Sequence, residues 1–437
     1  MIDIKILRAN PEIVKDAVKN KSVKWVDVDV VIELDKQKTT LKQQLDDLRS
    51  KRNELASQAK AWKPTPEMIE EWKKIKEEVQ NLEKKYEEVE AEFLTLFKKI
   101  PNLPTSDTPI WHSEEENQVV KKWWEAPKFD FPTKNHVEIA EKHDWIDKER
   151  AANVAWARFA YLKWDLVRIQ FALISWVIDS LWDQEVIEKI IKENNLKVSS
   201  KPFTPILPPY MIKTAPYDAM DRLEPREDRY KIEWEDLWLQ GSAEHVLGSM
   251  HANEIFEEKD MPIRYLGYAT SFRWEAWTYW KDMEWIIRMH QFDKLEMESF
   301  SCAEESHEEH LLFSAIQEYL MQQLKVPYQK LQKCTFDIWK PNAKWSDIEA
   351  WFPWQNKYRE THTADYMTDY QSRRLQTRVR RANWDIELIH TNDATAFACW
   401  RILIAIMENY QQADWSVVIP EVLRSYLGWK EIIKAKK

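Results

Sequence analysis

Arginine, glutamate and aromatic residues are concentrated in the segment TSFRWEAWTYWKDMEWIIRMHQFDKLEME, residues 270–298. Arg273 and Glu275 are two residues apart, which on a strand would place both side chains on one face. After a loop, polar and aromatic residues recur with period two from Arg288 to Glu296. The guanidinium group of arginine binds phosphate, a carboxylate accepts hydrogen bonds from amines, and an aromatic ring can stack on a base. The segment is therefore a candidate nucleotide site, although an exposed sheet face with cross-strand ion pairs would give the same pattern.

The part of the chain that must position these residues, 136–437, is predicted to be an α+β domain. A helix is expected over 166–194, and late helices around 396–412. Period-two or aromatic-rich patterns predict strands that include 203–207, 263–271, 286–300 and 386–391. Consecutive strands favour an antiparallel sheet with helices packed on it over alternating βαβ units. Neither GxGxxG nor GxxxxGK[ST] occurs, which argues against Rossmann and P-loop sites.

Residues 1–103 are predicted to be helical. One run repeats leucine every seven residues, at Leu34, Leu41, Leu48 and Leu55. A second run has the same period, at Ile75, Leu82, Val89 and Leu96. The breaker AKAWKPTPEM separates the runs, so we expect an antiparallel coiled-coil hairpin. A helix of roughly 30 residues at 1.5 Å per residue would make this hairpin a long arm.

Basic residues gather near the predicted tip of this arm: Lys51, Arg52, Lys60 and Lys63. A basic tip could hold the phosphates of a nucleic acid. Lysines on a solvated helix face, present only for solubility, would look the same. The proline-rich, polar residues 104–135 are expected to form a linker between the arm and the α+β domain.

Composition narrows the class of protein. No apolar run is long enough to span a membrane, and the charged N-terminus does not resemble a secretory signal. The three cysteines are far apart, which supports neither a disulfide framework nor a cysteine zinc site, and predicts a cytoplasmic setting. The net charge of −10 argues against sequence-blind nucleic-acid binding but permits a local basic patch.

Glycine is scarce and tryptophan abundant. The 4 glycines and 25 tryptophans together make 29 of 437 residues, close to the usual glycine content of about 7%. Segments such as RANWDIE and QADWSVV have the composition of turns, where glycine supplies a positive φ. We hypothesise a genetic code in which UGA specifies glycine, read here as tryptophan. A tryptophan-rich surface protein is the alternative.

Several motifs carry a resemblance to one family. FRWEAWTYWKDMEWIIRMHQFDKLE resembles motif 2 of class II aminoacyl-tRNA synthetases in its seryl form, FRxEAGxxGKDxxGxxRxHQFxKxE. GSAEH at 241–245 resembles the TAE serine-binding loop, and HTNDATAFACWR at 390–401 resembles motif 3. NKYRETHTADYMTDYQSRR at 356–374 is similar to the region of the metal-binding glutamate. Tryptophan stands at family glycine positions that include Trp277, Trp280, Trp285, Trp400, Trp415 and Trp429.

The resemblance implies that serine is activated by ATP and then transferred to its tRNA. Arg273, Arg401 and Glu360 would be catalytic, with Glu360 as the ligand of Mg²⁺. The residues that would bind ATP are Arg273, Glu275, Arg288, Phe292, Arg359, Glu360 and Arg401. The residues that would bind serine are Ser242, Glu244, Glu296, Thr363, Asp393 and Thr395. The basic tip of the arm would contact tRNA.

Some positions depart from the family pattern. Asp393 stands where many members have asparagine, and THTADYM replaces a more usual SSxSNxx. Trp400 precedes the motif 3 arginine, where the family's glycine allows close approach to ATP. An indole there would collide with the nucleotide or displace the helix, so the protein as written could be inactive.

The expected partners are serine, ATP, the serine tRNA and a second copy of the chain. A homodimer would form through motif 1, in the FTPILPPYM region with Pro208 and Pro209. A noncatalytic tRNA-binding paralogue of the same fold is the competing hypothesis. The presence of Arg273, Arg401, Glu296 and Glu360 favours the enzyme, because a decayed paralogue would be expected to lose some of them.

Overall fold

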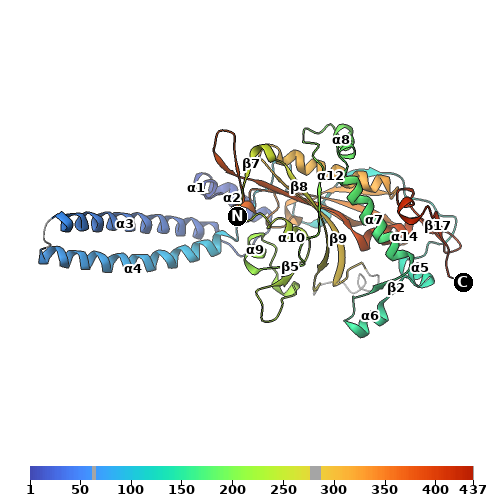
Figure 1. Ribbon diagram of the computed structural model, residues 1–437, viewed down its shortest axis with the longest axis horizontal. Coiled ribbons are helices and arrows are strands. Elements are labelled where there is room, and N and C mark those ends of the chain that lie inside the picture. The colour runs from blue at the N-terminus through green and yellow to red at the C-terminus, as the bar shows by residue number, and fades with distance from the viewer. Residues whose placement is uncertain (62–64, 276–286, 437) are drawn as a thin grey trace. The chain divides into compact units, whose positions relative to one another are not determined.

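A computed structural model describes residues 1–61, 65–275 and 287–436, in two units, Met1–Leu103 and Pro104–Lys437 (Figure 1). The first unit contains the helices α1 (Ile4–Ala9), α2 (Pro11–Asn20), α3 (Val28–Ala61) and α4 (Pro66–Phe97). α3 and α4 pack as an antiparallel hairpin whose core includes Leu45, Ile75 and Val79. The Thr65 hydroxyl accepts from Met68 N at 3.4 Å and caps α4. The predicted coiled-coil hairpin is confirmed.

An eight-stranded sheet is the centre of the second unit. Its order is β1-β10-β11-β12-β15-β9-β8-β4. In that order the strands are Gln118–Trp123, Tyr328–Gln332, Lys344–Phe352, Lys357–Thr368, His390–Ala398, Gln291–Ser301, Ile263–Phe272 and Thr204–Ile206. Neighbours pair antiparallel except β4 and β8, which are parallel. The predicted antiparallel sheet is therefore confirmed, with one parallel strand at its edge.

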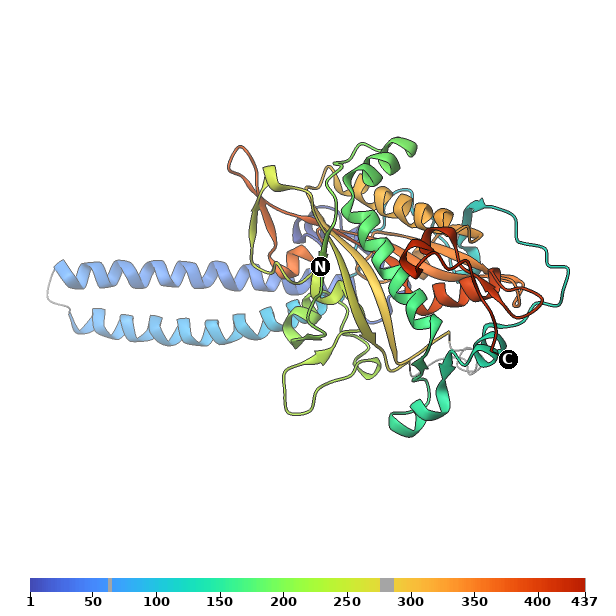
Figure 2. The same cartoon turned by 45° about the vertical axis from the view of Figure 1, so that its right-hand side comes forward.

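The second unit also contains helices, several of which cover this sheet (Figures 1 and 2). The larger ones are α5 (His136–His143), α6 (Lys148–Val154), α7 (Asp165–Trp182), α8 (Gln184–Glu193), α12 (Ser306–Gln323) and α14 (Cys399–Asn409). The short ones are α9 (Thr214–Ala219), α10 (Glu244–Leu247) and α13 (Ser372–Leu375). Apolar residues of α7, α12 and α14 form one buried core with those of the strands. These helices hold the sheet rigid from behind while its strand ends carry polar side chains.

Four small ladders complete the unit. They are β2 (Ile146–Asp147) with β3 (Tyr161–Leu162), β5 (Met211–Ile212) with β6 (Trp238–Leu239), β7 (Ile255–Glu257) with β13 (Arg378–Arg380) and β14 (Ile386–Leu388), and β16 (Val417–Val418) with β17 (Ile432–Ile433). In the described residues, no helix is long and apolar enough to cross a membrane.

The structure corrects several predicted boundaries. β8 ends at Phe272, so Arg273 and Glu275 follow the strand instead of sharing its face, and Glu275 turns the chain with a φ of 53°. β9 begins only at Gln291, which leaves Arg288 and His290 in the preceding loop. The β8–β9 ladder therefore stops at the pair Phe272 and Gln291, where the chain turns away.

Other predicted segments are divided. The helix expected over 166–194 breaks at Asp183, whose carboxylate caps α8 by accepting from Glu185 N at 2.8 Å. The strand expected at 386–391 is two strands, β14 and β15, in different sheets. Residues 104–135, expected to be a linker, contain β1, which pairs with β10 along the edge of the main sheet.

Tryptophans occupy backbone conformations that suit glycine. Among the described residues, φ lies between 57° and 71° at Trp124, Trp164, Trp234, Trp384, Trp415 and Trp429. A left-handed φ brings the Cβ of an L-residue against its own backbone and is a rare outlier for a bulky side chain. The conformations support the hypothesis that glycine belongs at these positions. Trp277, Trp280 and Trp285 lie outside the described residues.

Replacing Trp234 or Trp384 by glycine should stabilise the protein. Their side chains are 92% and 79% exposed, so little packing is lost when the strain is relieved. We expect each variant to raise the free energy of unfolding by roughly 0.5–1 kcal/mol, since the left-handed penalty exceeds the entropy cost of glycine. Urea unfolding measures this difference. Trp25, 61% exposed but without a positive φ, provides the control: W25G should not stabilise. Loss of stability in both W234G and W384G would contradict the glycine assignment.

Candidate active site

A cavity of about 380 Å³ opens among the ends of β9, β12 and β15 and the start of α14. The predicted site residues that line it are Glu244, Arg273, Glu275, Arg288, Phe292, Glu360, Thr363, Thr395 and Arg401. Ser242, Glu296 and Asp393 are buried directly behind this lining. Arg359 does not line the cavity, and its Nε donates to Gln355 Oε1 at 2.8 Å. The structure thus brings together residues that are up to 159 positions apart in the chain, from Ser242 to Arg401.

One end of the cavity is rich in arginine. Arg273 donates from Nε to Gly241 O at 2.8 Å, and its guanidinium lies 5.4 Å from the centre of the Phe292 ring. Arg288 is 3.3 Å from the carboxylate of Glu275 and is partly exposed. Arg273, Arg288 and Arg401 are thus three of the five arginines that line this cavity, and their guanidinium groups suit a polyphosphate.

Glu360 lies beside Arg401 at this end. Arg401 Nη1 donates to Glu360 Oε1 at 2.7 Å and to its carbonyl oxygen at 2.8 Å. Burial disfavours the Glu360 carboxylate, but Arg401 and Lys333 more than compensate and lower its pKa. The group is thus an ionised oxygen donor at neutral pH. This carboxylate and the hydroxyl of Thr363, on the same strand, are oxygen donors of the kind that Mg²⁺ prefers.

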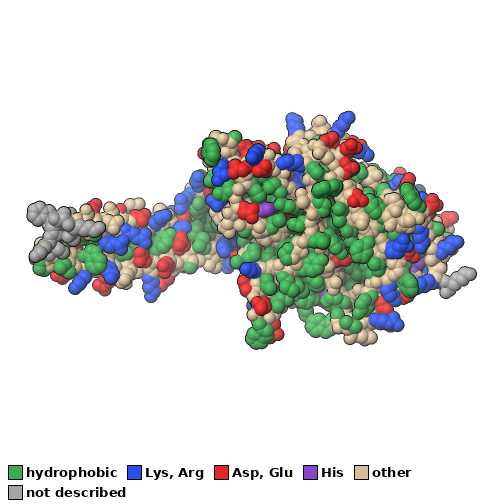
Figure 3. All heavy atoms as spheres, viewed as in Figure 1, with side chains coloured by type: hydrophobic (Ala, Val, Ile, Leu, Met, Phe, Trp, Pro, Cys, Tyr) green, Lys and Arg blue, Asp and Glu red, His purple; other side chains and the backbone are tan. Residues whose placement is uncertain are grey.

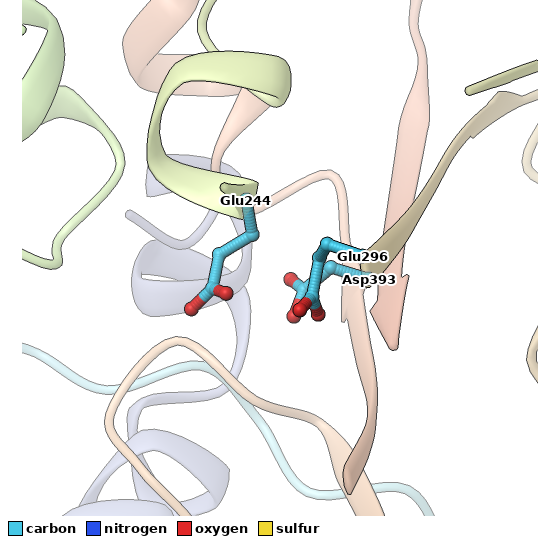
Figure 4. Close-up of side chains that lie close together, drawn as sticks. All are labelled: Glu244, Glu296 and Asp393. Carbon is cyan, nitrogen blue, oxygen red and sulfur yellow. The ribbon is translucent and has the colours of Figure 1, made fainter. Parts of the chain in front are cut away.

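The other end of the cavity holds three buried carboxylates, Glu244 on α10, Glu296 on β9 and Asp393 on β15 (Figure 4). Carboxylate oxygens of these residues lie within 4.8 Å of one another. Lys294 Nζ lies among them, 2.5 Å from Glu296 Oε2 and 3.5 Å from Glu244 Oε2. The fixed ammonium offsets part of the negative charge of this cluster and repels a divalent metal more strongly than a singly charged organic ammonium group.

Hydroxyl groups border the same carboxylates. Ser242 Oγ bonds the carboxylate of Glu244 and accepts from Lys294 Nζ at 3.0 Å. Thr363 and Thr395, from neighbouring strands, have hydroxyls 3.3 Å apart and face the cavity. These groups can hydrogen-bond a small polar ligand that reaches this end.

Burial shifts the protonation of the carboxylates in different directions. Burial raises the pKa of Glu296 to about 8, which Lys294 offsets only in part. For Glu244, the neighbouring charges of Lys294 and Arg222 outweigh burial and hold the pKa well below its usual value. Burial and the neighbouring Asp365 raise the pKa of Asp393. At neutral pH this end therefore combines an ionised carboxylate with carboxyl groups that still carry protons.

Sequence reasoning missed some of these groups. Lys294 belonged to the period-two row but received no role, although its place two residues before Glu296 was a usable signal. Arg222 and Asp365 line the cavity as well. Arg222 lies in an irregular loop after α9, and no local pattern in MDRLEPRED marks it.

Trp400 lines the cavity directly before Arg401 and packs on Met289. Its indole therefore occupies space that the family's glycine would leave open, as the sequence suggested. Burial raises the pKa of the preceding thiol, Cys399, so this cysteine stays protonated beside the site.

The predicted tip residues of the hairpin are described only in part. Lys51 is exposed and Arg52 is half-buried on α3. Lys63 and the side chain of Lys60 lie outside the described residues, as do Lys281 and Asp282 of the motif 2 segment.

Comparison with known proteins places the chain in a family. The seryl-tRNA synthetase N-terminal domain matches residues 1–104, and the class II tRNA synthetase core domain matches residues 229–410. A serine–tRNA ligase of Nitrosopumilus maritimus is 37% identical and covers 98% of this chain and 99% of its own. The crystal structure of seryl-tRNA synthetase from Pyrococcus horikoshii complexed with ATP is 35% identical, covers 100% of both chains and has a TM-score of 0.90. A cytoplasmic serine–tRNA ligase from Naegleria fowleri in complex with AMP is 26% identical over 99% of this chain and 97% of its own, with a TM-score of 0.84. The chain belongs to the seryl-tRNA synthetase family.

Proposed function

We propose that the chain ligates serine to its tRNA in two steps. The serine carboxylate attacks the α-phosphorus of ATP, which releases pyrophosphate and forms seryl-adenylate. The terminal ribose of the tRNA then takes the seryl group and AMP leaves. The observation that carries this proposal is one cavity that joins an arginine-rich end to a buried carboxylate end, in a chain whose full-length relatives are serine–tRNA ligases.

The arginine-rich end is proposed to hold ATP. Arg273 neutralises the α-phosphate as it becomes five-coordinate, and Arg401 neutralises the γ-phosphate. Phe292 stacks on adenine, whose exocyclic amine donates to Glu275. Arg288 holds the outer phosphates once its 3.3 Å contact with Glu275 opens. Arg359 has the same proposed role but must first leave Gln355 to reach the cavity.

Glu360 is proposed to hold Mg²⁺. The ion, when bound, supplies positive charge between the phosphates. Arg401 keeps the carboxylate ionised and fixes its direction through a hydrogen bond to Oε1, while a second bond holds the Glu360 carbonyl oxygen. No covalent enzyme intermediate is required, because positioning and charge neutralisation are sufficient for this type of displacement.

The carboxylate end is proposed to bind serine. Glu244 and Glu296 accept from the serine ammonium, with Asp393 behind them (Figure 4). Ser242, Thr363 and Thr395 complete the pocket with hydroxyl groups that can bond the serine hydroxyl. Alanine would leave these groups unpaired, which is a strong basis for selecting serine.

The hairpin is proposed to bind tRNA, with Lys51, Arg52, Lys60 and Lys63 against its phosphates.

A homodimer through the FTPILPPYM region is proposed as well. Leu207, Tyr210 and Met211 are exposed next to edge strand β4, and hydrophobic side chains gather on the face of the second unit where Figure 1 places α7, β8 and β9 (Figure 3). Such a surface is typical of a protein interface. A cytoplasmic location stays a prediction.

Serine-dependent exchange of pyrophosphate into ATP tests the function. The protein as written should be compared with a version that has glycine at Trp277, Trp280, Trp285 and Trp400. We expect strong exchange after glycine is restored and little before, because the Trp400 indole narrows the nucleotide cavity. Alanine in place of serine is the control and should support no exchange. Absence of exchange in both versions would instead favour a noncatalytic tRNA-binding protein.

Serine binding should strengthen as pH rises towards 8. Glu296, with a pKa of about 8, must lose its proton to accept from an ammonium group, and this loss becomes unfavourable at lower pH. The KM for serine should rise about tenfold per unit as pH falls from 7 to 6, and should level off above pH 8. The variant E296Q should show a higher KM without this dependence. A serine KM that does not change between pH 6 and 8, or an equal change in the KM for ATP, would contradict the role of Glu296.

The double variant K51A/R52A should weaken the binding of tRNA and leave the activation of serine unchanged. Loss of two phosphate contacts should raise the KM for tRNA roughly tenfold in aminoacylation and reduce its dependence on salt. Pyrophosphate exchange, which needs no tRNA, should not change. K36A removes an exposed lysine from the other part of α3, about 22 Å away at 1.5 Å per residue, and is the matched control. An equal effect of K36A would show that the contribution is only bulk charge.

A further inference from the structure

A second buried cation lies beneath the carboxylate end of the cavity. Arg222 comes from the loop after α9, and its side chain is only 2% exposed. Arg222 Nη2 lies 3.0 Å from Asp365 Oδ2 and 3.7 Å from Asp393 Oδ2. Its Nε lies 3.9 Å from Glu244 Oε1. One guanidinium therefore contacts carboxylates from α10, β12 and β15 at once.

This part of the structure carries an excess of buried acid. The carboxylates are those of Glu244, Glu296, Glu298, Asp365 and Asp393. Within the described residues, Arg222 and Lys294 are the Lys and Arg side chains within 4 Å of them. His245 also faces Glu244, but burial lowers its pKa well below 6.5, so the imidazole is neutral. Removing either cation would take a counter-charge from the ionised Glu244 and a donor from the buried acids beside it, which is costly.

The two cations divide the carboxylates between them. Lys294 contacts Glu244 and Glu296, whereas Arg222 contacts Asp365 and Asp393 and shares Glu244 with Lys294. Asp365 and Asp393 are direct partners in the register of β12 and β15, so neither strand can move its carboxylate away from the other. Burial alone would lower the pKa of Arg222, but Asp393, Asp365 and Glu244 more than offset this and keep it charged.

Arg222 and Asp365 also belong to the cavity wall. Both line it together with Glu244, Thr363 and Thr395, the residues assigned to serine. Asp393 stands where many members of the family have asparagine, an amide that needs no counter-ion. The chain thus has an acid at this position and an arginine within reach of it.

We propose that Arg222 is a positioning residue for serine selection, as the counter-ion that fixes Asp393, Asp365 and Glu244 under the serine pocket. This inference rests on the proposed function. Without the guanidinium, Asp365 and Asp393 lose the donor that holds both of them, and Glu244 loses one of the groups that fix its direction. The serine site would then distort, while the nucleotide end, which Arg222 does not contact, would keep its geometry.

A purely structural role for Arg222 makes a different prediction. If the guanidinium only filled space, its loss would affect both ends of the cavity and would not depend on the charge of its partners. If it acts as a counter-ion, neutralising the partners should remove the need for it. Asparagine has the size of aspartate and carries no charge, so D365N and D393N make this change without altering the volume.

The experiment compares R222M with R222M/D365N/D393N by serine-dependent pyrophosphate exchange. The variants are made in the version of the chain, as written or with glycine restored, that shows this exchange. We expect R222M to raise the KM for serine at least tenfold and to change the KM for ATP less than twofold. The triple variant should have a KM for serine at least threefold below that of R222M. R226M, which removes an exposed arginine from the same loop, is the matched control and should have no effect.

Two other outcomes of the exchange experiment overturn the inference. An unchanged KM for serine in R222M shows that the counter-ion is not needed. An equal rise for serine and ATP without recovery in the triple variant shows a structural role. If R222M does not fold, the triple variant decides: recovery of folding supports the inference, and a failure to fold overturns it. If the chain without these mutations shows no serine-dependent pyrophosphate exchange, the result contradicts the proposed function itself. That outcome is distinguishable from a failure of the inference about Arg222.

Discussion

The constraint on which this site depends is the cost of burying charge. Carboxylates, lysine and arginine are packed between strands and helices where water cannot solvate them, so each must find an opposite charge or retain a proton. Antiparallel neighbours solve this problem by geometry, because β12, β15 and β9 place residues of distant sequence directly opposite one another. The same rigid strands fix the direction of every polar group that faces the cavity. Burial in this protein therefore provides both electrostatic strength and preorganisation.

Much of the architecture could be predicted from local sequence. Heptad leucines and two prolines were enough for the hairpin, since a coiled coil depends on periodic contacts between its own two helices. The strands of the sheet were also detectable, but their ends were not. Glu275 leaves β8 through a left-handed conformation, and β1 joins the sheet from a polar segment, because tertiary pairing overrode the local pattern.

The site divides in the same way. Arg273, Glu360 and Arg401 could be assigned because spaced motifs of a known family carry them, and the structure brings all three to one cavity. Arg222 could not, because nothing within its own loop requires a cation. Its counter-charges, Asp365 and Asp393, follow 143 and 171 positions later in the chain, so only the fold reveals the need. The tryptophans with a positive φ are an intermediate case. Composition suggested that tryptophan stands in place of glycine, and the backbone angles identify the positions where this applies.

The contact of one guanidinium with carboxylates on two paired strands also constrains how such a pocket can evolve. Replacing Asp393 by a neutral residue would leave Arg222 with fewer acidic partners, and replacing Arg222 first would leave the paired Asp365 and Asp393 without their shared donor. Each single step therefore passes through a less stable intermediate, although the double change is tolerable. We expect these positions to covary, so that lineages hold either the charged set or the neutral set. Mixed combinations should be rare, and a pocket of this type should change its selectivity in jumps of two or three residues.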